Sequence, residues 1–179
     1  MKSFSKNQRY FKAKGKYHSA HQGWVKLIYP EKYIRPLDEY MESTANAVDK
    51  DGNCIQMVQY KSKLEKQMIE YCDANKFIIR WSEEPFAIPY IKPTDGKYHR
   101  YYIDFMLEFQ SGNKFLVEIK SYAETQKPEL PKHKTTKAMF NYQEALQTYL
   151  INLSKWKTAK KFAEDRGLKF IILTEKELF

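Results

Sequence analysis

Hydrophobic positions become regular from residue 59 onward, and the first regular stretch predicts a helix. Ser62 and Glu65 have the spacing of a capping box, which satisfies free backbone N–H groups at the start of a helix. Apolar side chains then recur at helical spacing as far as Cys72. The turn-forming residues 73–75 favour the end of the helix at that point.

Short apolar runs after this helix predict five strands. They cover residues 77–81, 86–91, 101–109, 114–121 and 168–174. The dipeptide Asp95-Gly96 is typical of a hairpin turn. The last run, 168–174, is almost entirely apolar and favours a buried strand.

Two helices are expected before the last strand. Residues 136–150 carry apolar side chains on a helical stripe, and Ser154 has the residue type of an N-cap for a second helix that Gly167 ends. The aromatic side chains of both helices are expected in the core, namely Trp156, Phe162 and the stripe from Tyr142 to Tyr149. This order of elements predicts a mixed α/β domain with one central sheet.

Charge narrows the class of partner. The chain has 179 residues, with 31 Lys or Arg against 22 Asp or Glu, a net charge of +9. Residues 1–35 alone carry +8, and their basic side chains are interleaved with aromatic rings. Such a mixture suits phosphate contacts and base stacking, although a solvated, partly flexible arm has the same composition. The surplus favours a polyanion, with nucleic acid first.

Several other classes are excluded. No run of about 18 apolar residues could span a membrane, and the basic N-terminus lacks the apolar stretch of a secretory signal. Two cysteines, Cys54 and Cys72, give no disulfide framework and suit a reducing compartment. His18 and His21 do not combine with them in the spacing of a zinc site.

Two carboxylates are predicted to meet across the hairpin formed by the strands 101–109 and 114–121. A three-residue loop with Gly112 in the left-handed conformation sets Asp104 opposite Glu118. Opposed carboxylates lie about 5 Å apart and repel each other. A divalent cation compensates for this repulsion, and Mg²⁺ suits two carboxylates completed by waters.

Lys120 shares a strand face with Glu118 and completes a hydrolytic arrangement. Its ammonium would orient or help to deprotonate a water for attack on phosphorus, beside a metal that polarises the phosphodiester. A surface network of Asp, Lys and Glu is the alternative. On the preceding helix, Glu65 is explained by the capping box alone or reaches the same metal, and Glu70 competes for that role.

At these residues the sequence resembles the PD-(D/E)XK nuclease superfamily, here as Asp104 and Glu118-Ile119-Lys120. More specifically, it resembles the head completion nucleases of large tailed bacteriophages, and the same core is similar to the transposon endonuclease TnsA. Further matching motifs follow in family order: Tyr60 to Glu65, Trp81 to Glu84, Ile88 to Tyr90, Asp95 to Lys97 and His99 to Tyr101. Ser121 departs from the family, which often has Pro there.

The resemblance implies a restriction-endonuclease-like α/β core, a central mixed sheet flanked by helices in the order αβββαβ. It implies a nuclease domain over residues 59–179 behind an N-terminal extension over 1–58. It also implies a Mg²⁺-dependent deoxyribonuclease, with Mn²⁺ as a substitute. Such an enzyme, an endonuclease rather than an exonuclease, would trim or process the ends of double-stranded DNA during head completion, before tail joining.

Carried over residue by residue, the resemblance selects Glu65 as the helical acid. It assigns Glu65, Asp104 and Glu118 as metal ligands and Lys120 as the catalytic lysine. Candidates for contacts with DNA phosphates are Lys97, His99, Arg100, Gln126, Lys127, Lys132 and Lys134. Ordinary loop charge is the alternative for each of these.

Head, portal or connector proteins are the further partners that this resemblance implies, and the virion or the host cytoplasm is the expected location. Two other functions fit the same residues. One is a DNA-binding virion component that kept a nuclease fold without activity. The other is a junction-resolving or transposition-type endonuclease.

Overall fold

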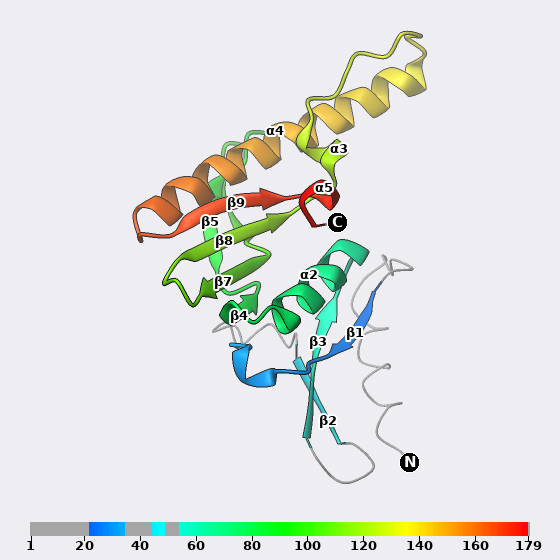
Figure 1. The fold of residues 1–179 in the computed structure, drawn as a ribbon. Coiled ribbons are helices and arrows are strands. Elements are labelled where there is room, and N and C mark those ends of the chain that lie inside the picture. Colours follow the sequence, from blue (N-terminus) through cyan, green and yellow to red (C-terminus); the bar gives the residue numbers. More distant parts are fainter. Residues whose placement is uncertain (1–21, 35–43, 49–53, 179) are drawn as a thin grey trace.

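The computed structural model describes residues 22–34, 44–48 and 54–178, with a four-stranded mixed sheet at its centre (Figure 1). The strands lie in the order β4 (Ile78–Glu83), β7 (Phe105–Phe109), β8 (Lys114–Ile119) and β9 (Lys169–Leu173). β4, β7 and β8 are antiparallel neighbours, whereas β9 runs parallel to β8. A parallel neighbour needs a crossover connection, which helix α4 (Thr136–Glu164) supplies. The predicted mixed sheet is confirmed.

Between β4 and β7 the chain forms a separate two-stranded hairpin. β5 (Ala87–Ile91) and β6 (Tyr98–Tyr102) pair antiparallel. Their turn has Gly96 at φ +66°, a left-handed conformation that glycine adopts at little cost. The Asp95-Gly96 prediction of a hairpin turn is therefore confirmed.

A three-stranded sheet precedes helix α2. It has the order β1-β3-β2 and consists of β1 (Gly23–Lys26), β2 (Thr44–Val48) and β3 (Cys54–Tyr60), with the short 3₁₀ helix η1 at Pro30–Lys32. Val25 and Tyr33 belong to the same hydrophobic cluster as Trp81 of β4. The division into an extension and a nuclease domain at residue 58 stays a prediction, and β3 runs across it. Most of the basic arm, with His18 and His21, lies outside the described residues.

Helix α2 (Lys63–Ala74) begins where the capping signal predicts. The hydroxyl of Ser62 accepts a hydrogen bond from the backbone N–H of Glu65, with 3.1 Å between nitrogen and oxygen. Met68 is fully buried against the main sheet, as is Cys72, whose pKa is raised by this burial. A buried thiol with a raised pKa is a packing residue rather than a reactive one.

One continuous helix, α4, replaces the two helices predicted over 136–150 and from Ser154, so the second N-cap prediction was wrong. The segment contains neither Gly nor Pro to interrupt a helix. The hydroxyl of Ser154 donates to the carbonyl of Ile91 in β5 at 2.8 Å, so it binds a neighbouring strand rather than a helix start. Thr135 is the true N-cap, and Gly167 at φ +67° follows the helix end as predicted. No helix in the described ranges has the length and hydrophobicity needed to cross a membrane.

The strand predicted over residues 101–109 is two strands with different partners. β6 pairs with β5, whereas β7 pairs with β4 and β8. The chain bends at Asp104, whose carboxylate accepts the backbone N–H of Ile119 in β8 at 2.7 Å. Apolar residues alternate through this bend without interruption, so the pattern alone does not reveal a change of partner.

The core prediction for the long helix was correct only in its C-terminal half. Trp156 is buried, and Phe162 packs against Phe86 with 5.2 Å between ring centres. None of residues 136–150, all of which the structure describes, is buried. This half of α4 extends past the sheet (Figure 1), so the Tyr142–Tyr149 stripe has no core to enter. β9 is an edge strand and only half-buried, against the prediction of a buried one.

Candidate active site

The hairpin between β7 and β8 has the register that the sequence predicts. Phe105 pairs with Val117, and Gly112 in the connecting loop has φ +81°. Asp104 and Glu118 are the next residues beyond that pair, so they lie opposite each other at the N-terminal end of β7. Two acids distant in sequence are thereby brought together by a turn of three residues.

Asp104 sits at the bend that precedes β7, with Oδ2 accepting the Ile119 N–H. Burial raises the pKa of this carboxyl well above its ordinary value of 3.8, and the charge of Glu118 raises it further. Lys120 acts in the opposite direction without cancelling the shift. The negative charge at Asp104 is therefore poorly compensated by the protein alone.

Glu118 is the deepest acid of the site, with 2 % of its surface exposed. Its Oε2 accepts the hydroxyl of Tyr101 at 2.5 Å, and its Oε1 lies 3.2 Å from Nζ of Lys120. A buried carboxylate needs such partners, because burying an unpaired charge in a protein interior costs on the order of several kcal/mol. Sequence reasoning did not assign Tyr101 a role. Its hydroxyl reaches Glu118 from β6, 17 positions earlier in the chain.

Lys120 follows β8 directly and carries the cation of the site. Burial alone would lower its pKa, but the charges of Glu118 and Asp104 outweigh this effect and raise it. The side chain is therefore an ammonium at neutral pH. It can stabilise developing negative charge or orient a water, whereas accepting a proton is disfavoured for a lysine held in its charged form.

The helical acid that approaches Asp104 is Glu65 and not Glu70. Glu65 lines a small hollow of about 20 Å³ together with Asp104. Its Oε2 accepts a hydrogen bond from the backbone N–H of Lys61 at 2.6 Å, which fixes the carboxylate at the N-terminus of α2. Glu70 is exposed and pairs with Lys66 one turn earlier, with 3.5 Å between the charged atoms.

Two further acids line the same hollow, Glu83 and Glu84 at the end of β4. The ammonium of Lys61 lies 2.6 Å from Glu84. Burial would lower the pKa of Lys61, but the charge of Glu84, with smaller effects from Glu65 and Glu83, raises it. Glu84 has φ +39°, an uncommon value for a residue other than glycine. Sequence reasoning did not single out this pair as part of the site.

Two carboxylates, those of Asp104 and Glu118, interact strongly with each other at the centre of the site. Within the described ranges, no three His, Cys, Asp or Glu side chains form a group that would hold a metal ion. The charge of Glu118 acts strongly on Asp104, and that of Glu65, which lines the same small hollow as Asp104, acts more weakly. The donor set at the centre is therefore the Asp104–Glu118 pair.

The candidates for DNA contacts are spread more widely. His99 binds Asp95 within the β5–β6 hairpin at 2.8 Å, and Lys97 is exposed in its turn. Arg100 is exposed on the face of β6 opposite to Tyr101, because neighbouring strand residues alternate between faces. The exposed side chains of Gln126, Lys127, Lys132 and Lys134 follow α3 (Tyr122–Thr125), in a loop that runs out beside the extended half of α4 (Figure 1).

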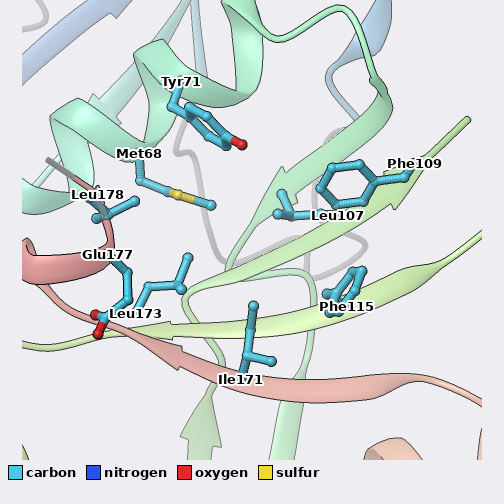
Figure 2. A pocket seen from close by; sticks show the side chains of 9 residues that line it. All are labelled: Met68, Tyr71, Leu107, Phe109, Phe115, Ile171, Leu173, Glu177 and Leu178. Atoms are coloured by element: carbon cyan, nitrogen blue, oxygen red, sulfur yellow. The ribbon is translucent and has the colours of Figure 1, made fainter.

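A larger hollow of about 250 Å³ lies on the other face of the main sheet (Figure 2). Its lining comes from α2, three strands and the C-terminal helix α5 (Glu175–Leu178): Met68, Tyr71, Leu107, Phe109, Phe115, Ile171, Leu173, Glu177 and Leu178. Side chains along β8 alternate between the two faces of the sheet, so Phe115 faces this hollow while Leu116 and Glu118 face the opposite side. None of the predicted site residues lines this hollow, so it belongs to packing.

Comparison with known proteins agrees with this geometry. The family described as TnsA-like endonuclease N terminal matches residues 75–175, more than half of the chain. The chain belongs to the TnsA-like endonuclease family. This TnsA-like endonuclease is also similar to the head completion nuclease of Enterobacteria phage T4, at 42% identity over 118 residues. That match covers 66% of this chain and 79% of the phage protein.

The family match confirms the predicted restriction-endonuclease-like fold class and the prediction of a nuclease. The matched span of this TnsA-like endonuclease contains Asp104, Glu118 and Lys120, whereas Glu65 precedes it. The roles of the individual residues rest on the geometry above.

Proposed function

We propose that this TnsA-like endonuclease hydrolyses DNA phosphodiester bonds with Mg²⁺, and that it trims or processes DNA ends during phage head completion. The observation that carries the chemistry is the buried Asp104–Glu118 pair with Lys120 beside it. The setting is supported by the similarity to a phage protein whose name is head completion nuclease. Double-stranded DNA is the substrate, and head, portal or connector proteins are the proposed partners in the virion or host cytoplasm.

The residues present fit a divalent cation with hard oxygen ligands. Asp104 and Glu118 bring two carboxylates to one place, with Lys120 as the ammonium paired to Glu118, and burial together with the charge of Glu118 raises the pKa of Asp104. Both acids would hold Mg²⁺, or Mn²⁺ in its place, with Glu65 contributing from α2. When bound, this cation would polarise the phosphodiester and stabilise the charge of the transition state.

The protein's own groups have separate tasks. Tyr101 donates to Glu118 and holds one carboxylate oxygen in place. The Ile119 N–H does the same for Asp104. Lys120, held as an ammonium, orients the attacking water and stabilises negative charge on the phosphoryl oxygens. Carboxylates fixed by such hydrogen bonds need little rearrangement at the moment of reaction.

The decisive experiment is a panel of blunt, overhanging, nicked, four-way and single-stranded DNAs incubated with the purified protein in Mg²⁺ or Mn²⁺. We expect cleavage of linear duplex ends, and we expect Asp104→Asn to abolish it while DNA binding persists. Preferential cutting of four-way junctions would instead identify a junction-resolving enzyme. No cleavage of any DNA, with particle assembly unaffected by Asp104→Asn, would identify a DNA-binding virion component.

A further inference from the structure

Lys155 lies on α4 next to Ser154, the residue that ties this helix to β5. The Ser154 hydroxyl donates to the Ile91 carbonyl at 2.8 Å, and Trp156 on the following position is buried. Both neighbours fix the rotation of the helix at this point. Lys155 is therefore held at one orientation relative to the β5–β6 hairpin, and its side chain is half-buried.

The ammonium of Lys155 is placed over two aromatic rings. Its Nζ lies 5.4 Å from the ring centre of Tyr101 and 5.8 Å from that of Tyr90. The two rings meet edge to face, with 6.4 Å between their centres. Tyr101 is the residue whose hydroxyl donates to Glu118, so Lys155 lies directly beside the acid pair. Cation–π contacts of this kind hold an ammonium without neutralising it.

No carboxylate in the described part of the chain lies within 4.0 Å of Lys155. Lys120 differs, since Glu118 pairs with it at 3.2 Å. Burial lowers the pKa of Lys155; the charges of Glu118 and Asp104 act in the opposite direction, and those of Lys120 and Lys92 offset them in part. Lys155 therefore lies near the acid pair without a direct ion pair to either acid, and its ammonium is left able to contact a further anion.

We infer that Lys155 binds a phosphate of the DNA backbone next to the bond that is cut, and that it positions the substrate over Asp104 and Glu118. The inference rests on the proposed function for its substrate. A phosphodiester supplies the direct anionic partner that Lys155 does not have, and Lys92, which directly follows β5, adds a second positive charge near it. Lys155 is thus a binding and positioning residue on α4, the helix for which the sequence pattern predicted two separate helices.

The test compares Lys155→Met, which keeps the length of the side chain without its charge, with Lys155→Arg. Lys157→Met is the matched control, because Lys157 is an exposed lysine on the same helix. Binding of a fluorescent linear duplex is measured by anisotropy in EDTA at several salt concentrations, so cleavage is not required. Cleavage in Mg²⁺ then gives kcat and KM, and thermal unfolding reports on the fold.

We expect Lys155→Met to weaken binding about tenfold and to reduce the slope of log K against log salt by about 0.9, the value for one phosphate contact on duplex DNA. KM should rise by a similar factor, with kcat changed less. Lys155→Arg should restore the slope, and Lys157→Met should not change it. If the proposed cleavage fails while these binding changes appear, the nuclease function is wrong and the phosphate contact stands.

An unchanged salt slope for Lys155→Met would overturn the inference. This holds also where thermal stability falls, since a lysine that merely covers the two tyrosine rings would lower Tm without altering the number of phosphates contacted. Loss of kcat alone, with affinity and slope unchanged, would equally overturn it. A slope change of the same size for Lys157→Met would show that the effect is general charge rather than this position.

Discussion

The carboxyl pair at Asp104 and Glu118 makes the stability of the metal-free protein depend on pH. The pKa of Asp104 is raised in the folded state, so above the ordinary value of 3.8 the folded protein binds more protons at this site than the unfolded chain. Stability from this group is present at low pH and is lost as pH rises towards the raised pKa. Replacing Asp104 by Asn removes that loss.

The magnitude follows from the proton count. One proton bound more tightly by the folded state reduces the free energy of unfolding by about 1.4 kcal/mol for each pH unit in this window. For a chain of this length, about 1 kcal/mol corresponds to roughly 2–4 °C in Tm. Asn has the same shape as Asp and its amide oxygen can accept the Ile119 N–H, so the hydrogen bond is kept. Asp104→Asn should therefore become progressively more stable than the natural chain as pH rises.

The assay is thermal unfolding followed by circular dichroism, in EDTA, from pH 2.5 to 7.5. The difference between the two proteins is the quantity of interest, because other titrating groups contribute to both. Asp95→Asn is a control of opposite sign. The Lys97 N–H and His99 lower the pKa of that exposed carboxyl, so its contribution to stability is lost as pH falls. Parallel pH curves for Asp104→Asn and the natural chain would refute the reasoning.

Two further predictions test the fold. Leu153→Pro should reduce the free energy of unfolding in urea by about 3 kcal/mol or more, since residue 153 lies inside one continuous helix. Thr136→Pro, at the first helical position, should be tolerated. Tolerance of Leu153→Pro would show a helix break at residue 153. Gly112→Ala should cost about 1 kcal/mol, because φ is +81° and no atom lies near the added methyl group, so that the cost is conformational. A gain in stability for Gly112→Ala would contradict the loop geometry on which the Asp104–Glu118 register depends.

Features determined by nearby residues could be predicted from the sequence. The cap at Ser62 depends on a residue three positions later, and the pairing of Asp104 with Glu118 depends on the length of one loop. Both were therefore found by counting. Spacing alone did not separate Glu65 from Glu70, since both lie on α2; the family resemblance selected Glu65, and the structure places it in one hollow with Asp104.

Features determined by distant contacts could not be predicted in this way. Ser154 has the residue type of an N-cap, but its hydroxyl binds Ile91, which is 63 positions away. The bend at Asp104 separates two strands that share one hydrophobic pattern. The positions of Tyr101 and Lys155 beside the acids follow from the packing of α4 on the β5–β6 hairpin, which no local pattern encodes.

The central claim is that Asp104 and Glu118 are the acids of a metal-dependent DNA nuclease. The most direct measurement is single-turnover cleavage of end-labelled linear duplex DNA in Mg²⁺ and in EDTA, by the natural protein and by Asp104→Asn. We predict cleavage by the natural protein in Mg²⁺ alone, and a rate at least about 10²–10³-fold lower for Asp104→Asn, the loss typical of a preorganised electrostatic group. Cleavage by Asp104→Asn within tenfold of the natural rate, or cleavage that persists in EDTA, would contradict it.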